Sequence, residues 1–263
     1  MAGLKDNLKR WREAAEIDWF SQFIKAWIPF NAWLTDTYGD LTDRALLDRV
    51  KSGGNVVFNR ITPMLDKSKD DSQDAQELRF HVAELHRLLQ GCVIASRHGQ
   101  VAFTTVDIGP NTIKDDKRTK WKRDFRVRRD HPNKLEVTLE ITATKTRVAF
   151  SLTLPGHDRT ALEDNPGFQA LENSHQAELR AMFDAVAPRK ITSVLAPHGA
   201  SGTLTFGGTA FVADSAKIFS ALVDISYCLR NALFHGSITP NDTHNDIYKP
   251  AYHIVMRLVR CTL

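Results

Sequence analysis

The sequence predicts a mostly α-helical protein with an inserted β-hairpin region. Three observations support this fold class: several long segments carry apolar residues at helical spacing, one pair of segments alternates apolar and polar residues, and the composition is globular. The chain has 263 residues, 42% hydrophobic and 25% charged, which excludes a disordered or fibrous protein and allows a buried core. We expect one helical domain over residues 1–263, with a basic, β-containing insertion at about 101–155.

The N-terminal third predicts three helices. Residues 4–34 place apolar and aromatic side chains mostly at helical spacing, and Pro29 predicts that this helix breaks shortly before the proline. A second helix is expected over about 42–50, with its first Thr or Asp as the cap. Residues 74–95 form the strongest amphipathic pattern, so we expect a central helix there.

The middle of the chain changes to a period of two. Apolar and polar residues alternate over 135–142 and again over 148–154, which predicts a β-hairpin with its turn near 143–147. Residues 160–187 return to an interrupted helical pattern. The Gly-containing, β-branched stretch 191–213 suits short strands or an irregular loop.

The C-terminal region predicts a long helix followed by a short one. The long helix begins near Asp214 or Ser215, either of which suits an N-cap, and ends at Gly236, which suits a left-handed residue after the last turn. A last, short helix is expected within 247–263, beginning near Pro250.

Cysteine usage and the N-terminus point to a reducing compartment. The three cysteines, Cys92, Cys228 and Cys261, are far apart and lack a C-x-x-C spacing, and no Ser or Cys nucleophile arrangement is readable. His81 and His86 are five residues apart and lie on different sides of a helix, so we expect neither a metal nor a cofactor. No signal-peptide pattern and no apolar run near the ~18 residues of a membrane span are present, so we expect a cytoplasmic protein that does not bind membranes.

The end of the long C-terminal helix carries the best candidate for chemistry. Arg230, Asn231 and His235 bring a permanent cation, an amide and an imidazole to one helix end. Asn231 and His235 are neighbours at i, i+4, whereas Arg230 and His235 are roughly 140° apart, so Arg230 must reach sideways. The alternative is structural: Arg230 forms a surface ion pair and His235 caps helix carbonyls.

These residues resemble the HEPN family, whose ribonucleases carry R-x4-6-H, often with a polar residue directly after the arginine. Arg230-Asn231-x3-His235 has this form. The N-terminal segment 23–33, FIKAWIPFNAW, is similar to the first-helix Phe-Asn-Ala pattern of bacterial HEPN-like proteins, and the central helix over 74–95 suits their bundle. The resemblance implies an HEPN-like helical bundle.

The resemblance also implies an activity and partners. HEPN ribonucleases cleave RNA without a metal, and two protomers pair their motifs in one composite cleft, so a homodimer is expected. His235 would exchange a proton with a ribose 2′-hydroxyl or the leaving 5′-oxygen, Arg230 would hold the phosphate, and Asn231 would orient either group. The products would be a 2′,3′-cyclic phosphate and a 5′-hydroxyl. The resemblance further implies a toxin or antiviral-defence effector, with an inhibitory antitoxin or a defence-system protein as a partner.

A basic segment provides candidate RNA contacts. Residues 114–134 hold ten Lys and Arg against four Asp, while the whole chain has a formal charge of only +4. Cations interleaved with aromatic rings suit phosphate binding and base stacking, and a solvated loop is the alternative. We expect these side chains to bind RNA: Lys117, Arg118, Lys120, Trp121, Lys122, Arg123, Arg126, Arg128 and Arg129.

A non-catalytic reading competes with the ribonuclease. An HEPN-like module would bind RNA, a nucleotide or a protein without cleavage. Catalysis predicts that Arg230 and His235 converge at an open groove, whereas a binding module allows either to be paired or buried.

Overall fold

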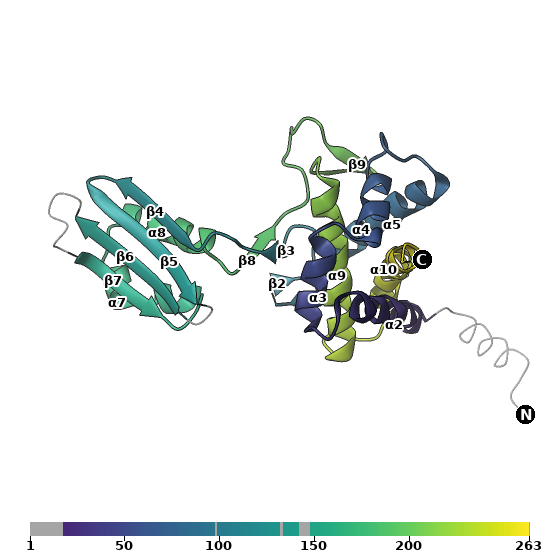
Figure 1. The fold of residues 1–263 in the computed structure, drawn as a ribbon, viewed down its shortest axis with the longest axis horizontal. Helices are drawn as coiled ribbons and strands as arrows, with labels where there is room; N and C mark the ends of the chain where they lie inside the picture. The colour runs from purple at the N-terminus through teal and green to yellow at the C-terminus, as the bar shows by residue number, and fades with distance from the viewer. Residues whose placement is uncertain (1–17, 98, 132–133, 142–147, 263) are drawn as a thin grey trace, which may run out of the picture. The chain divides into compact units, whose positions relative to one another are not determined.

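The computed structural model describes residues 18–97, 99–131, 134–141 and 148–262. The chain forms two compact units, each with its own hydrophobic core (Figure 1). We call Met1–Gly109 together with Ile191–Leu263 the helical unit, and Pro110–Lys190 the sheet unit. The chain passes from the helical unit to the sheet unit along β3 (Val106–Pro110) and returns along β8 (Arg189–Thr192), and these two strands pair.

The predicted fold class, a mostly α-helical bundle with an inserted β-hairpin, is wrong. The chain is 50% helical and 21% strand, and its described residues form four antiparallel sheets of two to four strands, so it is a mixed α and β protein. The prediction failed because strands without an apolar alternation, above all those of the basic segment, carry little periodic signal.

The helical unit contains six helices and two two-stranded sheets within its described residues, and a third two-stranded sheet, the β3–β8 pair, has residues in both units. Its helices are α2 (Trp19–Tyr38), α3 (Asp43–Lys51), α4 (Val56–Met64), α5 (Gln73–Gln90), α9 (Ser215–Phe234) and α10 (Asp242–Arg260). Its remaining strands are β1 (Ala95–Ser96), β2 (Gly99–Gln100), β9 (Leu204–Phe206) and β10 (Thr209–Phe211). None of the described helices has the length and apolar character that crossing a membrane requires.

The predicted break at Pro29 does not occur. Helix α2 continues through Pro29 to Tyr38, because its other side buries an apolar stripe that includes Phe23 and Phe30. Pro29 itself is exposed, so the carbonyl that loses its hydrogen bond there faces water. The part of the predicted helix over 4–17 lies outside the described residues.

The last helix starts earlier than predicted. Asn241 caps α10 by accepting a hydrogen bond from the His244 backbone N–H at 2.9 Å, so Pro250 lies inside the helix and is not its first turn. Helix α10 packs against α2 and α5, and the buried Tyr248 donates its hydroxyl hydrogen to the Leu229 carbonyl at 2.8 Å. This bond joins α10 to α9.

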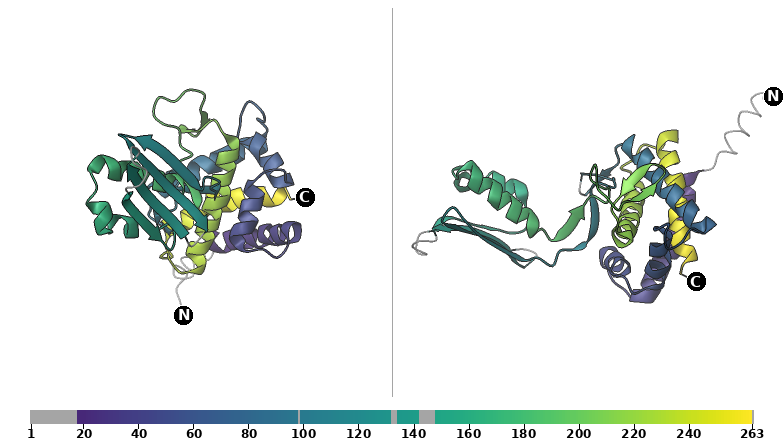
Figure 2. Two further views of the ribbon diagram at one scale, coloured as in Figure 1. Left: turned by 60° about the vertical axis from the view of Figure 1, so that its left-hand side comes forward. Right: turned by 90° about the horizontal axis from the view of Figure 1, so that it is seen from above.

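The sheet unit is one antiparallel sheet with helices on one face (Figure 2). Its strands follow the chain order: β4 (Asp115–Lys120), β5 (Arg123–His131), β6 (Lys134–Ile141) and β7 (Val148–Leu154). Its helices are α6 (Arg159–Glu163), α7 (Pro166–Gln169) and α8 (Asn173–Ala185). The β6–β7 pairing confirms the predicted hairpin, whose turn lies outside the described residues.

Alternation along the strands separates a buried face from an open one. Phe125, Val127, Val137 and Leu139 are at most 1% exposed and belong to the core shared with α8. The residues between them point to the open face. Strand β4, DDKRTK, has no apolar residue, so pairing with β5 and ion pairs must hold it in the sheet.

Candidate functional site: the pocket at the end of helix α9

The C-terminal end of α9 fixes the position of His235. Gly236 adopts the predicted left-handed conformation, with φ of +62°. Its N–H donates to the Leu233 carbonyl at 3.1 Å, and the Ser237 N–H donates to the Ala232 carbonyl at 2.9 Å. These two bonds form a Schellman motif, which ends the helix at His235.

A cavity of about 440 Å³ lies beside this helix end. Tyr227, Asn231 and His235 recur every fourth residue, so they lie along one side of α9 and its cap. The lining residues come from α3, from the β1–β2 segment, from α9 and from the turn after it: Arg44, Ala95, Ser96, Arg97, Tyr227, Cys228, Asn231, Ala232, His235 and Ser237. We call this cavity the His235 pocket.

Two guanidinium groups line the His235 pocket. Arg44 donates hydrogen bonds to Asp107 and Asp224, both at 3.2 Å, and lies 5.2 Å from the centroid of the Tyr227 ring. Its side chain remains 27% exposed. Arg97 is exposed and has no ion-pair partner among the residues that the structure describes. Among the described residues that line it, the pocket therefore combines a cation held by carboxylates, Arg44, with one that has no such partner, Arg97.

Arg44 belongs to a buried network of charges. Lys51 donates to the Asp107 carbonyl at 2.7 Å and lies 3.4 Å from the Asp224 carboxylate, which also accepts the Asp107 backbone N–H at 2.9 Å. Burial lowers the pKa of Lys51, and the carboxylates of Asp224 and Asp107 oppose this change. Two cations and two carboxylates thus balance in a place where a single charge would be costly.

Sequence reasoning missed this network. Lys51 and Asp224 are 173 residues apart, and no spacing motif links them. A signal was nevertheless present, because Asp224 interrupts the apolar stripe of α9 and Asp107 lies between Val106 and Ile108. A carboxylate in an apolar run predicts a buried partner of opposite charge.

The Cys228 thiol and the His235 imidazole, which both line the pocket, differ in whether they can exchange a proton with a ligand. Burial raises the pKa of the Cys228 thiol to about 12, so it stays protonated and forms a neutral part of the wall. His235 is exposed, and its ring has no hydrogen-bond partner within the described part of the chain. The imidazole is therefore available for proton exchange with a ligand in the pocket.

Arg230 does not line the His235 pocket. Its guanidinium lies 4.5 Å from the Phe234 ring centroid, donates to the Asn231 side-chain oxygen at 2.8 Å and pairs with Asp43 at 3.4 Å. The structure thus brings Asn231 and His235 together and connects Arg230 to them only through Asn231. The five-residue spacing, which turns the two side chains apart on a helix, accounts for this separation.

Several of the predicted RNA-binding residues face the helices of the sheet unit. Arg118 and Lys120 both bind the Glu178 carboxylate, at 2.7 and 2.6 Å. The hydrogen bond from Lys120, assisted by Arg118, lowers the pKa of Glu178. Arg129 donates to the Val186 carbonyl at 2.8 Å. These three cations stabilise the unit internally.

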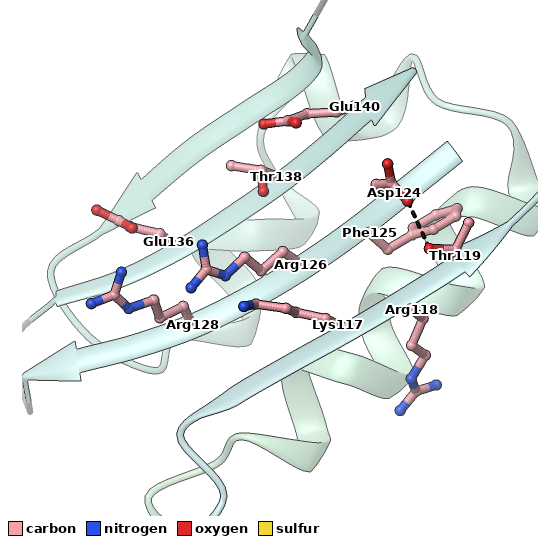
Figure 3. Close-up of a pocket in the computed structure, with 10 residues that line it drawn as sticks. All are labelled: Lys117, Arg118, Thr119, Asp124, Phe125, Arg126, Arg128, Glu136, Thr138 and Glu140. Atoms are coloured by element: carbon pink, nitrogen blue, oxygen red, sulfur yellow. Dashed lines mark hydrogen bonds between the residues drawn. The ribbon is translucent and has the colours of Figure 1, made fainter. Parts of the chain in front are cut away.

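Three more lie on the open face of the sheet, around a hollow of about 320 Å³ (Figure 3). Figure 3 shows Lys117, Arg126 and Arg128 on β4 and β5, with Glu136 on β6 beside them. Among the described residues that line this hollow, the one aromatic is Phe125, which is 1% exposed. The open face is therefore a mixed-charge surface without a ring for base stacking.

Carboxylates also match the cations of this face. Arg126 binds Asp115 through two hydrogen bonds of 2.9 Å, and Lys117 lies 3.5 Å from the same carboxylate. The hydrogen bond from Arg126 lowers the pKa of Asp115. Arg128 pairs with Asp130. The last three predicted RNA-binding residues lie at the β4–β5 turn: Trp121, Lys122 and Arg123.

The structure also contains a thiol–imidazole pair that the sequence analysis did not find. Cys92 Sγ lies 3.3 Å from His244 Nε2, and His244 Nδ1 lies 2.9 Å from Asn241 Oδ1. Cys92 follows the C-terminal end of α5, and His244 lies in the first turn of α10. Neither helix dipole favours charge separation in this pair, so we assign it no catalytic role.

Comparisons with known proteins give no family assignment. No protein-family model, no curated protein and no solved structure matches this chain. Within the described ranges, no group of three or more His, Cys, Asp or Glu side chains is placed to hold a metal ion.

Proposed function

We propose that the His235 pocket binds a phosphodiester of RNA and cleaves it by metal-independent transesterification. One observation carries this proposal: the His235 imidazole, which has no partner among the described residues, and the Asn231 amide share a cavity with the side chains of Arg44 and Arg97. Guanidinium forks match phosphate oxygens, and an imidazole can accept or donate a proton. The HEPN-like motif at residues 230–235 supports the same chemistry, whereas the fold does not contribute to the argument.

The proposed reaction uses the ribose as its nucleophile. The 2′-hydroxyl oxygen attacks the adjacent phosphorus and loses its proton to a base, and the 5′-oxygen leaves with a proton from an acid. His235 serves in one of these proton transfers, while Arg44 and Arg97 stabilise the added negative charge on the phosphate oxygens. The products are a 2′,3′-cyclic phosphate and a 5′-hydroxyl. DNA lacks the nucleophile and is not a substrate.

Asn231 and Arg230 act beside the reacting atoms. Asn231 lines the pocket and orients the phosphate or the imidazole, and Arg230 holds the Asn231 oxygen at 2.8 Å. Arg230 is thus a positioning residue in this proposal. Its removal should lower the cleavage rate less than removal of His235 does.

A second copy of the chain would complete the site. Transesterification needs two proton transfers, and one imidazole lies among the described residues that line the pocket. We propose a homodimer that brings two His235 pockets together. Light scattering or sedimentation should give twice the monomer mass of 29.6 kDa, and a persistent monomer would restrict the mechanism to one imidazole.

The cellular setting is also part of the proposal. Three cysteines without a disulfide pattern suit the cytoplasm. A ribonuclease toxin or antiviral-defence effector, restrained by an antitoxin or a defence-system partner, would arrest growth when expressed alone. The His235→Ala variant should relieve that arrest.

A binding module without catalysis is the second candidate. Arg230 favours this candidate, because it does not line the pocket and is paired with Asp43 and Asn231, whereas catalysis by Arg230 and His235 requires the two side chains to converge. Such a module would bind RNA through the same guanidinium groups and release it intact.

Incubation of end-labelled transfer RNA or total RNA in EDTA separates these functions. Wild-type protein should produce 2′,3′-cyclic phosphate ends, and the cleavage rate of His235→Ala should be lower by a factor of about 100 or more. His198→Ala removes another exposed histidine of the helical unit and is the matched control. Equal cleavage by wild type and His235→Ala excludes this pocket, whereas RNA binding without cleavage selects the module.

A further inference from the structure

The turn between β4 and β5 has an unfavourable backbone for its sequence. Lys120 pairs with Arg123 across the hairpin, and the two residues between them, Trp121 and Lys122, have φ of +51° and +56°. A two-residue turn with positive φ at both positions is the type I′ geometry that Asn-Gly adopts at little cost. Bulky side chains are strained there. A strained turn that persists suggests a role for its side chains.

The turn presents an aromatic ring to solvent. Trp121 is 57% exposed, although one side of it packs toward Phe125 and His175, with centroid distances of 6.0 and 5.7 Å. Lys120 Nζ lies 5.8 Å from the Trp121 ring centroid. Internal packing thus fixes the ring but leaves more than half of it uncovered, which is the arrangement of a stacking surface.

The same turn holds cations that no carboxylate of the described residues matches. Arg123 Nη1 is buried and has no hydrogen-bond partner within the described sequence, and Lys122 forms no ion pair with any described residue. This differs from the paired cations elsewhere on β4 and β5, such as Arg118 and Arg126. A buried donor without an acceptor is costly, so a shift of this partly exposed side chain toward an anion bound at the turn is favoured.

We propose that the β4–β5 turn binds single-stranded RNA. An unpaired base stacks on Trp121, while a neighbouring phosphate accepts hydrogen bonds from Arg123 and lies near the Lys122 ammonium. A planar ring beside unmatched cations favours a base with its phosphate over a simple anion, which needs no ring. The inference rests on RNA as the ligand of the proposed function, but it requires no cleavage.

The test replaces the turn with the residues that its geometry prefers. In the full chain, the Trp121→Asn/Lys122→Gly variant should be at least as thermally stable as wild type, because Asn-Gly suits the type I′ turn. Its affinity for a fluorescein-labelled 12-nucleotide oligouridine, measured by anisotropy, should fall about tenfold or more, since stacking and one phosphate contact are lost. Affinity for duplex RNA of equal length should change less.

Two further variants keep the test decisive. Arg123→Gln leaves both turn residues in place and should also weaken oligouridine binding, so it decides the matter if the double variant fails to fold. Lys134→Gln removes a paired cation of the same unit and should alter binding less than about twofold. The proposal is overturned if the double variant folds and binds oligouridine with the affinity of wild type. If the double variant does not fold, the proposal is overturned by wild-type affinity in Arg123→Gln.

The result also separates this inference from the cleavage proposal. Tight RNA binding that depends on Trp121, without any cleavage, supports RNA binding by the β4–β5 turn and contradicts the proposed ribonuclease activity. Cleavage that depends on His235, with the KM for RNA unchanged in the Trp121→Asn/Lys122→Gly variant, supports the ribonuclease activity and contradicts RNA binding by the turn. A wild-type chain that neither binds nor cleaves RNA overturns both.

Discussion

The His235 pocket and the basic strands of the sheet unit use positive charge in opposite ways. In the pocket, Arg44 is bonded to two carboxylates that are not among the lining residues, and its side chain remains 27% exposed. In the sheet unit, which has 16 Lys and Arg against 12 Asp and Glu, carboxylates such as Glu178 and Asp115 take up most strand cations directly. The formal charge of a segment therefore does not measure the charge that it offers to a ligand.

The largest expected effect is on the network behind Arg44. Asp224→Ala leaves Lys51 and Arg44 facing one carboxylate in a buried place, so the free energy of unfolding should fall by about 3–5 kcal/mol in urea denaturation. Glu84→Ala, which removes an exposed i, i+3 pair with Arg87, should cost under about 1 kcal/mol. Similar losses in the two variants would mean that the network is no more important than a surface pair.

Releasing the cations of the sheet unit is the next test. Glu178→Ala frees Lys120 and leaves Arg118 paired with Asp116 alone, so affinity for single-stranded RNA should rise and its salt dependence should steepen, while stability falls by about 1–3 kcal/mol. Asp115→Asn frees Lys117 and Arg126 on the open face at a smaller cost in stability. Unchanged RNA affinity in both variants would show that pairing with carboxylates does not prevent these cations from binding RNA.

Acid should weaken the helical unit before the sheet unit. His81 stacks on His253 at 4.2 Å, and burial, followed by the charge of His253, lowers the pKa of His81 to about 4. Between about pH 6.5, the ordinary value for histidine, and 4, the unfolded chain binds more protons, so the free energy of unfolding falls as the pH is lowered. After allowance for a ring that stays partly exposed to solvent, we expect the free energy of unfolding to fall by roughly 1–2 kcal/mol.

The sheet unit should respond at lower pH. The lowered pKa of Glu178 contributes stability above the ordinary carboxyl pKa of about 4.3, and this is lost as the pH falls through the lowered value. Hydrogen exchange of peptides from each unit, corrected for intrinsic rates, distinguishes the two windows. A His81→Phe variant should lose most of the change between pH 6.5 and 4, and an undiminished change would assign it to other groups.

The smallest effect concerns the end of α9. Gly236→Ala places a side chain at φ of +62°, where a Cβ would meet no atom within 4 Å, so the cost of about 1 kcal/mol is conformational. Gly91→Ala, at the ordinary helical φ of −88°, is the control and should cost less than about 0.5 kcal/mol. Urea denaturation of both variants measures the difference. Equal stabilities would mean that the turn after His235 tolerates another conformation.

Local signals predicted several elements correctly. Gly236 ended its helix as expected, Thr42 capped α3, and the alternation over 135–154 gave β6 and β7. Each of these signals depends on neighbours in the chain. Predictions failed where packing overrode a local rule, as at Pro29, which lies exposed in a helix whose other side is buried.

The candidate site was predictable only in part. Asn231 and His235 share the pocket because their i, i+4 spacing is a local property of the helix. Arg44 and Arg97 come from segments far away in the sequence, and no spacing rule could place them there. For the basic segment, the sequence counted cations correctly but could not show which would meet Glu178, because that contact spans about 60 residues.

Because β3 pairs with β8, the segment that encodes the sheet unit could be removed from the gene without interrupting the helical unit. Because the strands that lead into it and out of it are hydrogen-bonded neighbours, a short hairpin turn could replace everything between them without breaking the core of the helical unit. A gene with this architecture can gain, lose or exchange the unit as one cassette. The RNA contacts proposed for the β4–β5 turn and the chemistry proposed for the His235 pocket could then change independently within one polypeptide.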